Sequence, residues 1–188
     1  MWALVTDNTI TKIINKPRGM VIGDTQYSRN IFSFRWSNEE REAIGLYEVV
    51  FDNTNKKDQK YYNNTNQSFA FADGAVTASY GSATAKTLAD VTVDDIVVPG
   101  LKSKHKEIIK QQASSLLATY DWYVIRKADA GTAVPSAVTT YRAAVRTKSG
   151  EMETLIDDAA NVDALAALYV YNDDTPPVRP LGEWPEAV

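Results

Sequence analysis

The spacing of apolar residues changes once along this chain, at Pro99-Gly100, and that change constrains the fold more than any other feature. Before it, β-branched and aromatic runs are short and separated by turn residues, a pattern typical of β-strands. After it, apolar residues recur at intervals of three and four, as they do along helices. The sequence therefore predicts an α+β protein in which a β-rich part precedes a helical part.

The same change predicts three successive parts. Residues 1–98 are expected to form a β-rich docking module with one short helix, and residues 101–170 a helical hairpin domain. Residues 171–188 contain several prolines and are expected to form an extended tail that lies on a surface. A chain of 188 residues, 44% of them hydrophobic and 23% charged, can bury a real core.

Local signals place individual elements in the first part. Asp73-Gly74, flanked by two β-type runs, predicts a hairpin turn. Tyr27–Trp36 is rich in aromatic residues, and the period-2 alternation within it at residues 31–36 predicts a strand. This strand would carry three aromatic residues on one face: Phe32, Phe34 and Trp36. Ser37, followed three residues later by a glutamate, is a capping-box signature and predicts a short helix that stops at Gly45.

The stretch from Ala113 to Arg146 contains the strongest functional signal. It consists of a helix end, an aromatic connection at Asp121–Ile125 and a second helix that begins near Pro135, and these elements predict an αα-hairpin. From Val138 to Val162 the apolar residues then step by three and four, with one polar interruption at Lys148. This spacing predicts a heptad-like seam along the second helix.

Residues 121–146, DWYVIRKADAGTAVPSAVTTYRAAVR, resemble the C-terminal segment of tail-fibre assembly and tail assembly chaperone proteins of tailed bacteriophages. In that family a Leu-Leu and Asp-Trp element precedes a proline and a Tyr-Arg helix. The matching positions here are Leu116, Leu117, Asp121, Trp122, Pro135, Tyr141, Arg142 and Arg146. Trp184-Pro185 is similar to the family's Trp-Pro ending. Met1–Arg35 has no counterpart in compact members, which favours a larger, permanent component over a pure chaperone.

The resemblance implies a structural protein of a phage tail or tail fibre, made in the host cytoplasm and retained in the virion tail. Two alternatives remain open, an assembly chaperone that leaves the particle and a glycan-binding receptor module that uses the aromatic strands. Expected partners are tail or tail-fibre proteins and further copies of the chain, which would form a homo-oligomer. A mild net charge of −4 and the lack of a long apolar window predict no nucleic-acid binding and no membrane insertion.

The titratable residues do not form a recognisable catalytic pattern. The chain has no cysteine, and its single histidine, His105, lies among lysines. We therefore expect no enzymatic activity, no cofactor and no metal site, and the candidate functional residues are partner-binding ones. These candidates are Leu116, Leu117, Trp122, Tyr123, Tyr141, Arg142, Val145, Arg146, Met152, Leu155 and Trp184.

Overall fold

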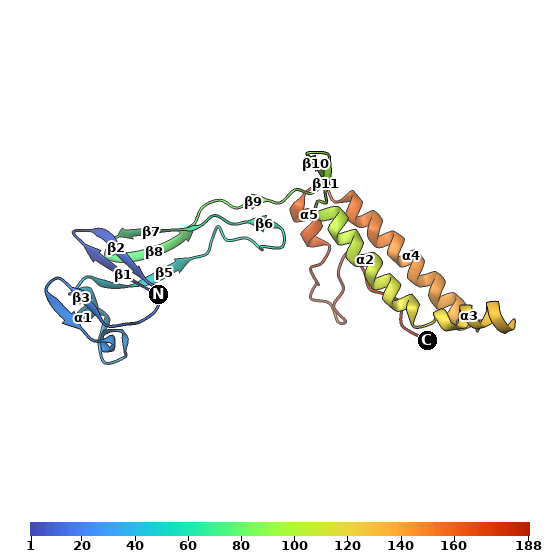
Figure 1. The fold of residues 1–188 in the computed structure, drawn as a ribbon, viewed down its shortest axis with the longest axis horizontal. Helices are drawn as coiled ribbons and strands as arrows, with labels where there is room; N and C mark the ends of the chain where they lie inside the picture. Colours follow the sequence, from blue (N-terminus) through green and yellow to red (C-terminus); the bar gives the residue numbers. More distant parts are fainter. The chain divides into compact units, whose positions relative to one another are not determined.

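The computed structural model describes residues Met1 to Val188 as two compact units, Met1–Thr84 and Ala85–Val188 (Figure 1). The first unit is rich in strands and the second contains the long helices, so the predicted α+β class is confirmed. The division falls before the expected boundary at Val98, because a short hairpin over residues 91–98 belongs to the second unit.

A five-stranded sheet with the order β2-β1-β5-β8-β7 forms the centre of the first unit. Its strands are β1 (Trp2–Thr6), β2 (Thr9–Ile14), β5 (Leu46–Asp52), β7 (Gln67–Ala72) and β8 (Ala75–Tyr80). β5 pairs with β8 in parallel, and the other neighbours are antiparallel. Asp73 and Gly74 both have positive φ in the turn between β7 and β8, so the predicted hairpin is confirmed.

Residues of this sheet contribute to two hydrophobic clusters. One cluster consists of Ala3, Val5, Val49, Val76 and Ala78, and the other of Ile14, Met20, Ile31 and Leu46. The remaining elements of the first half are β3 (Met20–Ile22), β4 (Thr25–Tyr27), the 3₁₀ helix η1 (Arg29–Phe32), α1 (Asn38–Glu42), β6 (Tyr62–Asn63) and β9 (Thr84–Ala85), the last at the division between the units.

The strand predicted from the alternation at residues 31–36 is wrong. Serine side chains bond locally there: Ser28 accepts from the backbone N–H of Asn30, and the Ser33 hydroxyl donates to the Asn30 carbonyl. Such bonds compete with a β-ladder and fold the segment into η1 and a turn. The aromatic residues consequently share no face, and Phe34 is 95% exposed.

The capping box at the start of α1 is confirmed. The Glu40 backbone N–H donates to the Ser37 hydroxyl at 3.2 Å, and the Glu40 carboxylate accepts from the Ser37 N–H at 2.7 Å. Arg41 on this helix is buried and donates to three neutral acceptors, which are the Ile31 and Ser33 carbonyls and the Asn38 side chain. The guanidinium thereby ties the turn after η1 to α1.

The second unit contains β10 (Val91–Val93), β11 (Ile96–Val98), α2 (Leu101–Ala118), α3 (Asp121–Ala130), α4 (Ser136–Asp158) and α5 (Val162–Ala167). α2 packs against α4, which forms the predicted αα-hairpin (Figure 1). Gly150 lies inside α4 without ending it. None of the helices combines the length and the apolar character required to span a bilayer.

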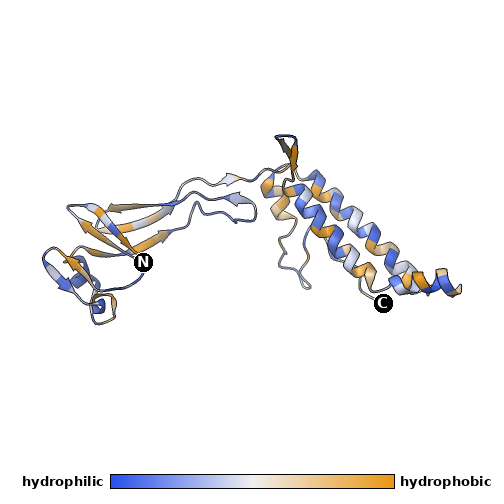
Figure 2. Ribbon diagram, viewed as in Figure 1, coloured by the Kyte–Doolittle hydropathy of each residue, from blue (hydrophilic) through white to orange (hydrophobic).

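The predicted seam along α4 holds for most of its length and then shifts by one residue. Val138, Tyr141, Val145 and Met152 are buried, but Ile156 is buried in place of the expected Leu155. The last two seam positions, Ala159 and Val162, are buried as predicted, although α4 ends at Asp158 and Val162 begins α5. An α-helix with 3.6 residues per turn drifts away from a seven-residue repeat, so the buried stripe moves along the sequence. Figure 2 shows apolar and polar residues alternating along both long helices.

The C-terminal tail packs back onto the helices. Leu181 is fully buried, and its backbone N–H donates to the Leu168 carbonyl at 3.0 Å. The Trp184 indole N–H donates to the Gln112 side chain on α2 at 3.2 Å. The tail is therefore part of the helical unit's packing.

Asp90 caps the N-terminus of α2 from a distance in the sequence. Gly100 at the N-cap offers no side chain, and the Asp90 carboxylate instead accepts from the Gly100 N–H at 2.8 Å and from the Ser103 hydroxyl at 2.9 Å. Backbone carbonyls of Thr87 and Leu88 accept from the next two N–H groups. The helix start is thus satisfied by residues 87–90.

We expect the stability of the helical unit to fall at low pH through Asp90. Its pKa is lowered from 3.8, first by the Ser103 hydroxyl and then by the Gly100 N–H. A lowered folded-state pKa stabilises the fold above about pH 4, and this contribution is lost as the pH falls through the folded pKa. Thermal unfolding of wild type and Asp90→Asn across this range should show a shallower acid dependence in the variant. If the unfolding temperature fell equally with pH in both proteins, Asp90 would not be the group responsible.

Candidate protein-interaction surface

Three of the expected partner-binding residues lie in the interior of the helical unit. Tyr141 is 4% exposed, and Val145 and Met152 are fully buried. Burial raises the pKa of Tyr141 above its usual range. These residues cannot contact a partner while the fold is intact, and their assignment as contact residues is wrong. The seam that indicated them is the packing stripe of α4 against α2.

Arg142 also has a structural role. Its Nη1 donates to the Leu117 carbonyl at the end of α2 (2.7 Å) and forms an ion pair with Asp121 at the start of α3 (2.8 Å). One guanidinium therefore fixes the junction of three helices, and its side chain is only 11% exposed. Arg146, one turn further along α4, is exposed.

Leu116, Leu117 and Trp184 are half-buried and pack against the cluster of Ala113, Tyr141 and Val145. Leu116 and Trp184 also share a shallow groove of about 410 Å³ between α2 and the tail. Its other lining residues are Ile108, Gln111, Gln112, Ser115 and Arg179. The groove offers an apolar floor with amide and hydroxyl groups at its edge.

Residues 121–125 form the start of α3, so the aromatic connection predicted between two helices is itself helical. Asp121 occupies the first turn, where a carboxylate is favourable near free N–H groups, and Arg142 holds it there. These interactions outweigh the modest helix propensity of the aromatic and β-branched residues that follow. The helix ends at Gly131, whose φ of 66° provides the left-handed cap.

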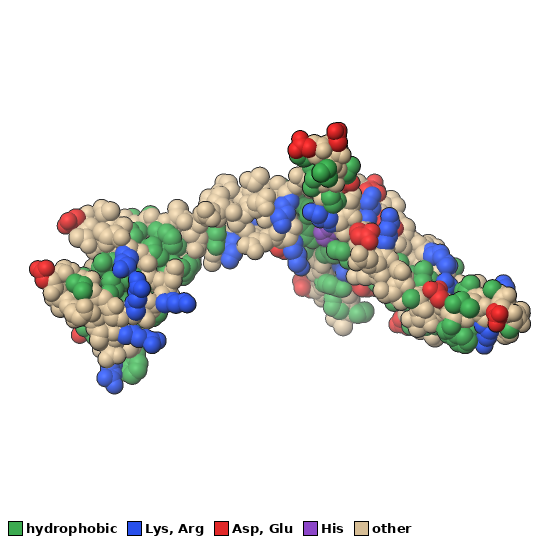
Figure 3. Space-filling view, viewed as in Figure 1, with side chains coloured by type: hydrophobic (Ala, Val, Ile, Leu, Met, Phe, Trp, Pro, Cys, Tyr) green, Lys and Arg blue, Asp and Glu red, His purple; other side chains and the backbone are tan.

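No residue of α3 is buried, although residues 122–125 are aromatic or β-branched. Trp122 is 50% exposed, Val124 45% and Ile125 67%. Val124 and Ile125 were not among the candidate residues, because a short aromatic and β-branched segment does not show from its sequence which of its side chains are covered. Figure 3 shows hydrophobic side chains gathered at this end of the helical unit, with charged groups around them. Trp122 and Ile125 are three residues apart and lie on one side of the helix. The exposed apolar residues of the helix, Trp122, Val124 and Ile125, are together called the α3 surface below.

Arg126 holds the aromatic part of the α3 surface in place. Its guanidinium carbon lies 4.8 Å from the centre of the Trp122 ring and 5.2 Å from that of Tyr123. The two rings are themselves 3.7 Å apart. The Nε atom of Arg126 is buried without a hydrogen-bond partner. Stacking on two rings therefore fixes this side chain, and the indole is presented in a defined orientation.

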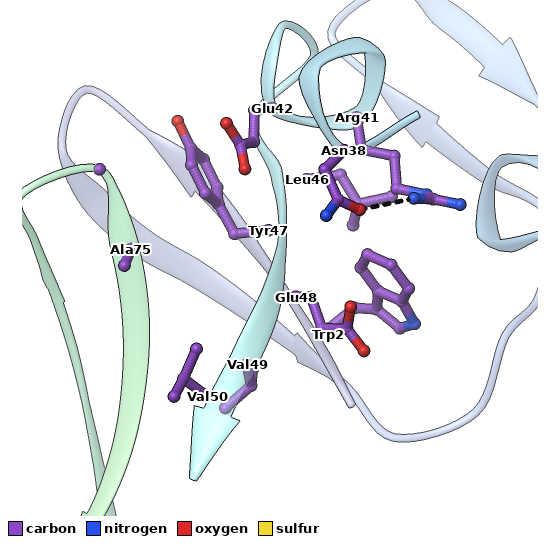
Figure 4. Close-up of a pocket in the computed structure, with 11 residues that line it drawn as sticks. Trp2, Asn38, Arg41, Glu42, Leu46, Tyr47, Glu48, Val49, Val50 and Ala75 are labelled. Carbon is purple, nitrogen blue, oxygen red and sulfur yellow. Dashed lines mark hydrogen bonds between the residues drawn. The ribbon is translucent and has the colours of Figure 1, made fainter. Parts of the chain in front are cut away.

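A second concavity lies in the β-rich unit beside β5. It has a volume of about 300 Å³, and Figure 4 shows the carboxylate of Glu48 beside the Trp2 ring and that of Glu42 on the side of Tyr47. Asn38 and Tyr47 also line it. Carboxylates beside an aromatic ring can accept hydrogen bonds from a cationic or hydroxyl-bearing group.

The aromatic residues expected for a glycan-binding face are dispersed. Phe32 packs edge-on against Trp2 at 5.7 Å, and Trp36 against Tyr27 at 5.9 Å. Both lie against the core cluster around Ile31, whereas Phe34 points into solvent. They form no common stacking platform, so this part of the glycan-binding expectation has no structural support.

The single histidine takes part in packing between helices. His105 Nδ1 lies 2.7 Å from the Tyr169 hydroxyl, which joins α2 to the segment after α5. No cluster of three or more His, Cys, Asp or Glu side chains is arranged to hold a metal ion. Comparisons with models of protein families, with curated proteins and with solved structures find no match to this chain.

Proposed function

We propose that this chain is a structural protein of a bacteriophage tail or tail fibre, and that it binds another tail protein through the α3 surface. The observation that carries the proposal is a ten-residue helix with no buried residue that exposes Trp122, Val124 and Ile125. Trp122 and Ile125 lie on one side of this helix, and exposed apolar groups gathered in this way are typical of protein-binding sites. The phage assignment is supported by the resemblance of residues 121–146, which include α3.

The geometry of α3 suits a binding element. The Arg142 bridge fixes the helix to the ends of α2 and α4, and Arg126 orients the indole. Because these groups are already ordered, little conformational entropy is lost when a partner binds. Aromatic side chains held in this way are the residues that contribute most to binding free energy in protein interfaces.

The partner should offer an apolar pocket with acidic groups at its rim. The apolar groups of α3 fit such a pocket, and Lys127 and Arg146 are exposed cations near the same end of the unit. In the virion, repeated copies of the chain would form a homo-oligomer and present several α3 surfaces at once. The alternative role is an assembly chaperone, in which the same surface covers an unfinished fibre protein and then leaves it.

Mass spectrometry of purified virions separates these two roles. A structural component is present at a fixed copy number, whereas a chaperone is abundant in the infected lysate and absent from particles. Absence from both would contradict the proposed function as a whole.

The α3 surface itself is tested by substitution. We expect Trp122→Ala combined with Ile125→Ala to weaken binding to the co-purified tail protein by roughly 10- to 100-fold, because both exposed apolar groups are removed. Val170→Ala is the matched control, since Val170 is also exposed, at 63%, but lies outside α3. Surface-immobilised binding measurements should show wild-type affinity for the control. Equal affinities for all three proteins would exclude α3 as the contact.

A further inference from the structure

The hairpin of β10 and β11 is fixed rigidly to the start of α2. Its two strands enter and leave through residues 87–90 and Pro99-Gly100, where Asp90 and the Thr87 and Leu88 carbonyls bond the first N–H groups of the helix. The approach is so close that a Cβ on Gly100 would lie 2.3 Å from the Ala89 carbonyl oxygen. Residues 87–90 and Pro99-Gly100, called the stem below, therefore hold the hairpin close to the first turn of α2.

One face of the hairpin consists entirely of β-branched apolar side chains. The register pairs Val91 with Val98 and Val93 with Ile96, and directly opposed residues share a face. All four side chains are exposed: Val91 by 40%, Val98 by 43%, Val93 by 53% and Ile96 by 67%. We call this set the hairpin face. Thr92 and Val97 form the opposite face.

The tip and the base of the hairpin carry opposite charges. Asp94 and Asp95 form the two-residue turn, both with positive φ as a type I′ turn requires. Lys102 and Lys104 lie in the first turn of α2, directly after the stem. Figure 3 shows the red carboxylates at the tip, the green side chains along the strands and blue lysines at the base.

We propose that the hairpin face binds the same face of a second copy of this chain, in a two-fold antiparallel arrangement. A two-fold contact needs a self-complementary surface, and an apolar face that meets itself satisfies this requirement. In the antiparallel orientation each acidic tip meets the basic base of the other copy. A parallel orientation would place Asp94 and Asp95 of both copies together and is disfavoured by repulsion.

The proposal deepens the oligomeric part of the proposed function and rests on that part alone. An isolated two-stranded hairpin is only marginally stable in water, so covering its apolar face stabilises the hairpin as well as the dimer. Four side chains bury less than the roughly 800 Å² per partner typical of stable complexes, so the contact should be weak. Weak contacts suffice where many copies are held together at high local concentration.

Sedimentation velocity of the full chain tests the proposal. From roughly 1 µM to several hundred micromolar, wild type should pass from monomer to dimer with a Kd of about 10–100 µM. Val93→Thr combined with Ile96→Thr keeps the β-branched shape and removes apolar surface, and we expect it to raise Kd at least tenfold. Val97→Thr on the opposite face is the control and should dimerise like wild type.

The charge contribution is tested separately. Asparagine tolerates the positive φ that this turn requires, so Asp94→Asn combined with Asp95→Asn keeps the turn and removes the charge at the tip. We expect a higher Kd that no longer depends on salt, whereas wild-type dimerisation should weaken as salt is added. Circular dichroism and thermal unfolding of every variant establish that the helical unit is intact.

Three results would overturn the proposal: a monomer at every concentration, self-association that Val93→Thr with Ile96→Thr leaves unchanged, or equal weakening by Val97→Thr. None of these depends on finding the chain in virions or on the α3 variants. Failure of the dimer and failure of the proposed tail function are therefore distinguishable.

Discussion

Gly45→Ala is expected to destabilise the β-rich unit by about 3 kcal/mol or more. Gly45 has a φ of 77°, which L-residues rarely adopt, and a Cβ at this position would lie 2.3 Å from the Val5 carbonyl oxygen. That oxygen belongs to β1, and the Val5 N–H donates to the Gly45 carbonyl at 2.8 Å. Neither backbone can move away without breaking the entry of β5 into the sheet.

Gly74→Ala separates the two causes of this cost. Gly74 has nearly the same φ, 74°, but no atom lies within 4 Å of the position of an added Cβ. It should cost only about 1 kcal/mol, which is the penalty for the left-handed backbone alone. Hydrogen exchange of β1 and β5 amides in both variants measures the difference. If both variants lost the same protection against hydrogen exchange, the backbone at Val5 would relax around the added Cβ at little cost.

The sequence predicted those elements whose cause is local. The capping box at Ser37 and the turn at Asp73-Gly74 depend on a few adjacent residues, and both are present. The hairpin at residues 91–98 was not predicted, because two aspartates with positive φ are a weaker turn signal than Asp-Gly. The aromatic strand predicted at residues 31–36 is absent, because serine side chains compete for the backbone there.

The candidate site was predicted less completely, for a different reason. Periodicity identifies which residues of α4 face one way, but it does not reveal what covers that face. Tyr141, Val145 and Met152 are covered by the chain itself. The sequence alone does not show that Val124 and Ile125 are exposed, because this depends on α3 being a helix with no buried residue. The apolar periodicity therefore located the helical region of the candidate surface, but it assigned core residues of that region as partner contacts.

The second large effect on stability is expected for Met152→Ala. This variant distinguishes a core residue from a residue that contacts a partner. Met152 is fully buried in α4, so truncation removes packing and leaves a cavity. We expect a loss of about 2–5 kcal/mol in the free energy of unfolding. Ile125→Ala, at a site 67% exposed, should change stability by no more than about 0.5 kcal/mol.

The two variants should show opposite effects when unfolding and binding are measured together. Below its unfolding temperature Met152→Ala still presents the α3 surface, because Trp122, Val124 and Ile125 lie outside the core, and it should bind the tail protein with near wild-type affinity. Ile125→Ala should unfold like wild type and bind more weakly. If Met152→Ala instead lost binding without a change in unfolding, Met152 would be a contact residue and the interface would lie between α2 and α4. That result would require the helical pair to open when the partner binds, because Met152 has no exposed surface while the pair is closed.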